Sequence, residues 1–438
     1  MGSSLRISRR ELLRRGAMIA GTPAALPFVG SCGPGSAPGG DPDRITLRTW
    51  SPDTRDAALA SERWWHDAFM AANPQLRVEQ LTVPYDEDTV KLKAAHRAGT
   101  NVPDILWTYN QNLYAYGLEG LVRPLNDLMS RIGPERYPRQ VLDGIRVDGT
   151  YYSVPFVGFP FFVYCRRDLY AARGLHPPET HEELLENIAA LHDPPGRYGY
   201  LLTNQYIADT FNLKTAMWTH GAYFFDAEDN LALDRPETLR AWAFYKELGK
   251  YSPPGSMAQG DLESRELMLD GRVAHMFTTT SFAADFGPED LRRQGAFAYP
   301  IQPGAKGASL DFNALALPAR SRQPELAKDM IGFLLEPENF QEFLTRTVVG
   351  WVPMLEDAWT DRYLNHPRIA AVREYLEVGR ISQETGIVST GYFGPSPNSR
   401  VLIATDIEKQ IGDRLVVFDQ SPEEVLEWSV SVLRKALA

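Results

Sequence analysis

Cysteine and histidine are scarce in this chain of 438 residues, which has two cysteines and eight scattered histidines. His181-Glu182-Glu183 lacks the second histidine that a zincin requires. The sequence also contains no Gly-x-Ser-x-Gly nucleophile elbow and no Gly-rich phosphate-binding loop. These absences argue against the corresponding hydrolases and nucleotide-binding enzymes. We therefore expect no metal site, no cofactor and no catalytic residue.

Positive charge is also in short supply. The chain has 45 lysines and arginines against 56 aspartates and glutamates, for a net charge of −11. Residues 1–31 hold five of the arginines and one of the glutamates, so the rest of the chain carries 40 basic and 55 acidic residues. This balance disfavours non-specific attraction to nucleic acid or anionic lipid. We expect no nucleic-acid partner.

No apolar run near the N-terminus is long enough to span a membrane. The segment from Gly16 to Ser31 is short and is broken by Pro23 and Pro27. It follows Ser8-Arg9-Arg10-Glu11-Leu12-Leu13, which matches the twin-arginine export pattern of bacteria. We interpret residues 1–31 as a signal peptide.

The end of that segment, Val29-Gly30-Ser31-Cys32, resembles the lipobox of bacterial lipoproteins, which implies lipidation of Cys32. The alternative is a plain signal peptide with an incidental cysteine. Residues 32–44 are rich in glycine and proline, which indicates a flexible tether. We expect a protein outside the cytoplasm, anchored to the outer face of the cell membrane or periplasmic. Cys165 then has no disulfide partner and is expected to be a small core residue.

The length of the chain favours two domains, and the first half predicts an α/β fold. Strands are expected at 45–50, 76–83 and 103–107, with helices at 56–72 and 86–98 between them. This alternation is typical of a parallel sheet flanked by helices. Ligands of such sheets bind beyond the carboxyl ends of the strands, here Trp50 to Asp53 and Thr108 to Gln111.

The stretch from Asp148 to Leu175 organises the rest of the chain. A turn at Asp148-Gly149-Thr150 is followed by an extended run, and Phe161 to Cys165 is continuously apolar. Pro155 and Pro160 predict two strands joined by a stiff corner, as a hinge between lobes requires. Beyond it we expect helices at 181–192, 204–218, 235–251, 263–269 and 324–335, and a buried strand at 273–277.

Several motifs in this order are similar to those of bacterial extracellular solute-binding proteins of the sugar-binding type. They are Asp148-Gly149-Thr150 with Val154-Pro155, the Tyr164 to Leu169 strand end, Gly174 to Leu184, Leu269 to Met276, Pro324 to Leu335 and Gly350-Trp351-Val352-Pro353. The resemblance covers the chain after Arg44. It implies a two-lobe periplasmic-binding-protein fold with parallel-rich sheets flanked by helices and a ligand cleft at the hinge. It also implies hinge crossings near 158–161, 277–282 and 313–318. Lobe 1 is then 45–157 with 283–313, and lobe 2 is 158–282 with 318–438.

Three segments depart from the family pattern. Phe156 to Phe162 lacks side chains that could bond a hydroxyl, so only stacking through Phe156 or Phe159 remains there. Thr278 to Phe282 replaces the usual Gly-x-Trp, and Asp311-Phe312 replaces a pair of glycines. The specificity of this chain is therefore expected to differ from that of its relatives.

The function that the resemblance implies is capture of a small neutral carbohydrate outside the cell and delivery to the membrane subunits of an ABC importer, by a monomer. Sugar sites combine aromatic platforms with amide, hydroxyl and carboxylate groups. The candidate ligand-binding residues are Trp50, Tyr109, Asn110, Phe156, Phe159, Asn204, Trp218, Thr280, Ser281, Phe312, Asn313, Trp351 and Tyr392.

Two other functions remain open at this stage. One is an extracellular carbohydrate-active enzyme, because the 56 acidic residues leave room for the carboxylate pair of a glycosidase. The other is a receptor of the same fold for a glycerophosphodiester, a peptide or a metal. Adjacent Tyr151 and Tyr152 point to opposite faces of a strand, which is a poor arrangement for binding one metal.

Overall fold

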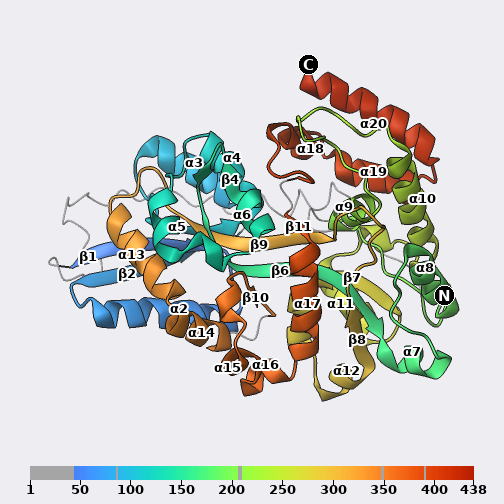
Figure 1. Ribbon diagram of the computed structural model, residues 1–438, viewed down its shortest axis with the longest axis horizontal. Coiled ribbons are helices and arrows are strands. Elements are labelled where there is room, and N and C mark those ends of the chain that lie inside the picture. The colour runs from blue at the N-terminus through green and yellow to red at the C-terminus, as the bar shows by residue number, and fades with distance from the viewer. Residues whose placement is uncertain (1–43, 85–86, 206–209, 347–349, 389–390) are drawn as a thin grey trace, which may run out of the picture. The chain divides into compact units, whose positions relative to one another are not determined.

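The computed structural model describes residues 44–84, 87–205, 210–346, 350–388 and 391–438 (Figure 1). The predicted signal peptide, Cys32 and most of the tether lie outside these residues. Among the described residues, none of the helices has both the length and the apolar character needed to cross a membrane.

A mixed sheet of nine strands forms the framework, and its main path runs in the order β10-β6-β9-β3-β1-β2. The strands of this path are β1 (Ile45–Ser51), β2 (Leu76–Thr82), β3 (Ile105–Tyr109), β6 (Val154–Arg166), β9 (Ser309–Ala316) and β10 (Val352–Pro353). The predicted parallel pairing of the first three strands is confirmed, since β1 pairs with β2 and β3 in parallel. β9 runs antiparallel to both β3 and β6 and pairs in parallel only with the two-residue strand β11 among the described residues. The sheet is therefore less rich in parallel pairs than expected.

β6 is one strand of 13 residues and not the two strands predicted from its prolines. Pro155 sits at a β-bulge, where the register with β9 shifts before Val157. Pro160 lies at the end of that ladder, opposite Leu310. From Phe161 onward the strand changes partners and pairs with β7 (His275–Thr279) and β8 (Gln294–Phe297). A single continuous strand thus pairs with β9 and β10 in its first half and with β7 and β8 in its second, at the place where the sequence predicted a passage between lobes.

Helices cover both faces of the first part of the sheet. Figure 1 shows α2 and α14 on one side and α3 and α4 on the other. These helices are α2 (Asp56–Ala72), α3 (Asp88–Ala98), α4 (Asn110–Leu118), α5 (Asn126–Ile132), α6 (Arg139–Ile145), α13 (Pro324–Leu335) and α14 (Pro337–Arg346). Trp65 of α2 is buried and donates its indole N–H to the Met330 carbonyl of α13 at 3.1 Å. Helices α13 and α14 therefore pack in the same hydrophobic core as α2. The lobe boundaries predicted from the sequence had assigned both helices to lobe 2.

A second hydrophobic core gathers around α9 and α10. Its helices are α7 (Arg167–Arg173), α8 (His181–Ala190), α9 (Thr210–Thr219), α10 (Pro236–Lys250), α18 (Arg400–Thr405), α19 (Ile407–Val416) and α20 (Pro422–Leu437). Every residue of α9 is buried, so it is the central helix of this core. Phe297, Tyr299 and Ala308 also belong to it. The sequence boundaries placed these three residues in lobe 1. Because their side chains pack with Phe161 and Val163 of β6, the chain leaves this core later than predicted.

Helix α17 (Arg373–Thr385) packs against β6 where that strand changes partners. Tyr164 of β6 and Tyr375 of α17 stack with their ring centroids 5.5 Å apart. Gly379 of α17 has no room for a side chain, since a Cβ there would lie 2.8 Å from Thr280 and 3.1 Å from Pro160. The remaining short elements are β4 (Arg146–Val147), β5 (Thr150–Tyr151), β11 (Ile387–Val388), α11 (Asp261–Leu269), α12 (Pro288–Arg293), α15 (Asp361–Leu364) and α16 (Pro367–Ala370).

Candidate functional site

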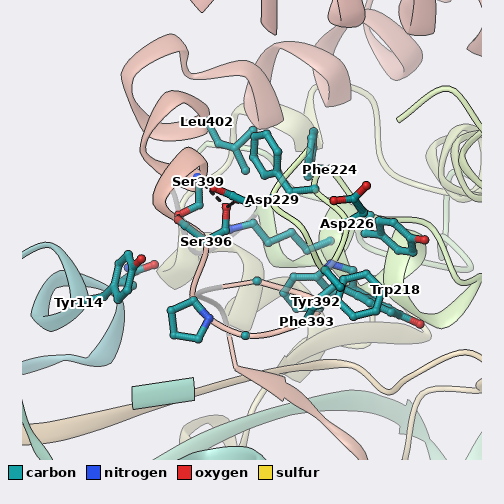
Figure 2. Close-up of a pocket in the computed structure, with 18 of the residues that line it drawn as sticks. Tyr114, Trp218, Phe224, Asp226, Asp229, Tyr392, Phe393, Ser396, Ser399 and Leu402 are labelled. Carbon is teal, nitrogen blue, oxygen red and sulfur yellow. Dashed lines mark hydrogen bonds between the residues drawn. The ribbon is translucent and has the colours of Figure 1, made fainter. Parts of the chain in front are cut away.

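A cavity of about 110 Å³ opens between residues of α4 and residues of the second core. Figure 2 shows Tyr114 on one side of it and Trp218, Phe224, Tyr392 and Phe393 on the other. The α4 wall is built on the hydrophobic core that contains Leu47, Trp65 and Ile105, which we call the first core, since Leu113 and Tyr116 of the same helix are buried in it. The cavity is therefore lined from both cores, as a ligand site in a two-lobe fold requires.

Aromatic rings form much of the second wall. Tyr223 lies 5.0 Å from Tyr392 and 4.9 Å from Phe393, measured between ring centroids. Two of these rings make cation–π contacts. The Arg235 guanidinium lies 4.5 Å from the centre of the Tyr223 ring, and the Lys306 ammonium lies 4.7 Å from the centre of the Tyr392 ring. Rings in this arrangement offer flat apolar faces of the kind that bind the carbon side of a sugar or sugar alcohol.

Asp229 fixes the loop that carries these rings. Its carboxylate accepts hydrogen bonds from the Ser396 hydroxyl and from the Asn398 backbone N–H at 3.2 Å. The Asn398 amide also donates to the Asp229 carbonyl at 2.9 Å. Asp229 has a φ of 64°, which aspartate tolerates better than most residues. These bonds hold residues 391–398 against the 223–230 turn, although the two segments are far apart in the sequence.

Charged side chains complete the lining. Lys214 of α9 and Glu408 of α19 form a buried ion pair with 3.1 Å between Nζ and Oε2. Asp226 accepts backbone hydrogen bonds from Glu228 and Asn230 at 3.0 and 2.8 Å, so part of its carboxylate stabilises its own turn. With Asp229, the lining contains three carboxylates and one ammonium group.

Burial changes the acid–base properties of this wall. It raises the pKa of Tyr392, and partial burial lowers the pKa of Lys306. The pKa of Tyr114 is raised by burial and then by the charges of Asp229 and Asp148. The two tyrosines therefore stay neutral and offer hydroxyl groups near pH 7.

Two of the predicted ligand-binding residues, Trp218 and Tyr392, line this cavity. Three others form an aromatic row beside the β6 bulge. The Phe159 ring lies 6.5 Å from Tyr109 and 6.3 Å from Trp351, centroid to centroid. Tyr109 and Phe159 are half-buried, whereas Trp351 is only 3% exposed and stacks on Phe343 at 6.1 Å. Trp351 therefore packs the core in this arrangement and does not present a free face to a ligand.

Phe156 and Phe312, predicted as stacking or contact residues, are fully buried in the first core. Phe156 meets the edge of Trp107 at 4.7 Å between centroids. Neither ring has surface for a ligand in this structure, because both side chains fill the space under β6 and β9. Trp50 is 6% exposed and lies on β1 opposite Leu106, also in the first core.

The predicted polar contacts are dispersed. Asn313 pairs with Tyr109 across β9 and β3, and Asn110 opens α4. Asn204 lies in the second core, where its amide donates to the Lys409 carbonyl and to Asp413 of α19 at 2.8 and 2.9 Å. Thr280 is buried, and Ser281 accepts a hydrogen bond from Arg265 at 3.0 Å. A Cβ on Gly350 would lie 2.2 Å from the Thr280 carbonyl, so the 280–281 and 350–351 segments do meet.

Sequence reasoning missed most of the cavity lining. The missed residues include Tyr114, Lys214, Tyr223, Asp226, Asp229, Phe393 and Glu408. Gln111 also lines the cavity, and it ends the segment after the third predicted strand, where a ligand was expected. The others lie on turns and helices that come together only in the folded chain. Among the described residues, no three His, Cys, Asp or Glu side chains gather in a way that could hold a metal ion.

A model of the family described as "bacterial extracellular solute-binding protein" matches residues 64–371. The chain belongs to this family. A putative binding protein of Brucella abortus (strain 2308) is 26% identical over 322 residues, which cover 72% of this chain and 78% of that relative. The mannitol-binding protein of Pseudomonas aeruginosa is 31% identical over 224 residues, covering 49% of this chain and 51% of the relative.

Solved structures of solute-binding proteins share the fold. The sugar-binding protein MalE of Xanthomonas citri superposes with a TM-score of 0.74 at 20% identity, covering 89% of this chain and 98% of MalE. UgpB of Mycobacterium tuberculosis, solved with glycerophosphocholine, gives a TM-score of 0.73 at 20% identity and covers 90% and 98%. This solute-binding protein therefore has the two-lobe, MalE-like periplasmic-binding-protein fold that the sequence predicted.

Proposed function

We propose that this protein captures a small neutral carbohydrate or sugar alcohol in the cavity between α4 and the 391–396 loop. The observation that carries the proposal is the make-up of this cavity. Aromatic faces such as Trp218 and Tyr392 lie beside carboxylates, and the lining comes from both cores. Apolar ring faces and fixed hydrogen-bond acceptors are what a polyhydroxylated molecule needs for selective binding.

The relatives support a binding role and not catalysis. Both relatives described above are named as binding proteins, and one of them is named as a mannitol-binding protein. A solute that contacts both cores would favour a closed arrangement by its higher affinity for that state. The closed protein would then deliver the solute to the membrane subunits of an ABC importer.

The location that we propose follows from the N-terminal sequence. Export by the twin-arginine route and lipidation of Cys32 would hold the protein at the outer face of the cell membrane. The tether of residues 32–44 would then leave the folded part free to reach the importer.

Calorimetric titration of the mature protein tests this function. The panel consists of D-mannitol, ribitol, D-tagatose, maltose and maltotriose, with glycerophosphocholine, short peptides and Zn²⁺ as non-sugar probes. We expect one-to-one binding of a neutral polyol and recovery of the unchanged molecule by NMR. Hydrolysis of a glycoside would make the protein an enzyme. Binding of a non-sugar probe alone would keep the receptor and remove the carbohydrate.

A further inference from the structure

Lys214 and Glu408 form an ion pair in the wall of the cavity. Lys214 lies on α9, one turn before Trp218, and Glu408 lies in the first turn of α19. Their side chains are 10% and 7% exposed, and both residues line the cavity. A buried ion pair is a weak source of stability, because removing two charges from water costs about as much as their attraction returns. The position of this pair in the cavity wall points to a role in binding.

One oxygen of Glu408 has no partner. Its Oε2 faces Lys214, but its Oε1 is buried without a hydrogen bond to any described residue. Buried polar atoms of native proteins are nearly always hydrogen-bonded, so the unpaired oxygen of a residue that lines the cavity is a candidate acceptor for a donor on a bound molecule. The Lys214 ammonium group and the N-terminal end of α19 both stabilise negative charge at this carboxylate.

We infer that the Lys214–Glu408 pair determines the specificity of the cavity, with Glu408 Oε1 accepting a hydrogen bond from one hydroxyl group of a neutral polyol. This inference rests on the proposed function, since it takes the cavity as the solute site. Lys214 holds the other carboxylate oxygen and so fixes the direction in which Oε1 points. Trp218 and Tyr392 supply the apolar faces, and Glu408 selects the hydroxyl group.

The charges around the pair favour a neutral molecule. Asp226 and Asp229 also line the cavity, so its lining holds three carboxylates and one ammonium group, whereas the cations of Arg235 and Lys306 lie against the rings of Tyr223 and Tyr392. The charges of the lining itself therefore disfavour a bound anion. A site built to bond a hydroxyl group strongly rejects the analogue that lacks it, because the acceptor then stays buried and unpaired. The pair therefore predicts sharp discrimination against a single deoxy analogue of the solute.

Three variants of the mature protein test the inference. Glu408→Gln keeps the shape of the side chain and removes its charge. The double variant Lys214→Met with Glu408→Leu replaces the whole pair by apolar groups of similar size, which a core tolerates. Glu423→Gln, in the exposed first turn of α20, is the matched control. Each is titrated by calorimetry with the member of D-mannitol, ribitol, D-tagatose and maltose that binds the wild type most tightly, and with the monodeoxy analogues of that member.

We expect Glu408→Gln to weaken binding of the parent molecule about tenfold to a hundredfold, the usual range for a lost hydrogen bond to a charged group. For one deoxy analogue the wild type and both Glu408 variants should bind alike, and the control should match the wild type throughout. Thermal melting checks that each variant is folded. If the double variant is unfolded, the result for Glu408→Gln alone decides the test.

Two results overturn the inference and are distinguishable. If no neutral polyol binds the wild type, the proposed function fails and the inference fails with it. If a polyol binds the wild type, but Glu408→Gln keeps both its affinity and its discrimination against every deoxy analogue, the cavity or its neighbourhood still binds the solute and the pair has only a structural role.

Discussion

At the scale of single residues, a place in the cavity lining, and not the degree of burial, separates aromatics available to a ligand from core aromatics. Trp218 and Tyr392 line the cavity and Trp351 does not, although the three are 4%, 8% and 3% exposed. Trp351 was expected from its motif to be a stacking platform, yet it is packed between Phe159, Phe343 and Trp107. Tyr392 had no stronger signal in the sequence, and it lines the cavity. The residue type alone does not distinguish a core aromatic from a ligand-binding one, because both roles need a large flat side chain.

The Trp351→Ala variant is therefore expected to lose fold stability. Removing a buried tryptophan should lower the free energy of unfolding by roughly 3–5 kcal/mol, and Trp351→Phe should cost much less because it refills most of the space. Urea denaturation followed by circular dichroism measures both values. If Trp351→Ala were as stable as the wild type but bound the solute more weakly, Trp351 would be a stacking platform for the ligand after all.

Glu62 on α2 is expected to destabilise the folded protein at alkaline pH. Burial and then the charge of Asp53 raise its pKa to about 8, against the lowering effect of the hydrogen bond from Ser51 at 2.7 Å. Between pH 4.5 and 8 the folded state keeps a proton that the unfolded state has lost. Stability from this group is therefore intact below about pH 4.5 and falls as the pH rises towards 8, by about 1.4 kcal/mol per pH unit.

Glu62→Gln removes this dependence. The variant should be more stable than the wild type at pH 8, and the difference should shrink steadily towards pH 5. The free energy of unfolding across this range is the measurement, with Asp67→Asn, exposed on the same helix, as the control for a simple change of charge. A difference between Glu62→Gln and wild type that stays constant with pH would refute the buried, protonated carboxyl group.

At the scale of elements, close backbone approach joins segments that are distant in the sequence. Gly350 precedes β10 and has a φ of 67°. A Cβ there would lie 2.2 Å from the Thr280 carbonyl and 2.7 Å from Ser281 Cα. Both of those atoms belong to the backbone and cannot swing away. Glycine at 350 is therefore required by contact as well as by conformation.

Gly120 offers a matched comparison, since it has the same φ of 67° and no atom within 4 Å of the position that a Cβ would take. We expect Gly120→Ala to cost roughly 1–2 kcal/mol of stability for the left-handed conformation alone. Gly350→Ala should cost roughly 1–3 kcal/mol more, because it also forces two backbone segments apart. Equal losses in urea denaturation would mean that the 280 and 350 segments do not touch.

Elements with a regular apolar pattern could be predicted, and those that depend on tertiary contacts could not. β1, α2, β2, α3 and β3 lie where periodicity placed them, within a few residues. β6 was predicted as two strands, because a bulge that absorbs Pro155 leaves no separate signal in the sequence. The cavity escaped prediction because Asp229 and residues 396–398 lie far apart in the chain and meet only through hydrogen bonds in the folded state.

At the scale of the whole molecule, the lipid anchor is a prediction from the sequence. The Cys32→Ser variant should move from the membrane fraction to the soluble extracytoplasmic fraction. Its solute affinity should not change, because all of the cavity residues lie beyond the tether. Mass spectrometry of the native protein should find a diacylglyceryl group on an N-terminal Cys32. A mature protein that begins elsewhere and is soluble would contradict the anchor.

Hydrogen exchange followed by mass spectrometry tests most directly whether a neutral polyol is bound between the two cores. The mature protein is compared with and without the most tightly bound sugar or sugar alcohol of the panel. We predict slower exchange in peptides that cover both walls, namely residues 110–118 of α4 on one side and 218–230 with 391–399 on the other. Peptides that cover α20 serve as the internal reference, and their exchange rates should not change. Protection confined to one wall, or protection elsewhere with none in these segments, would contradict binding between the two cores.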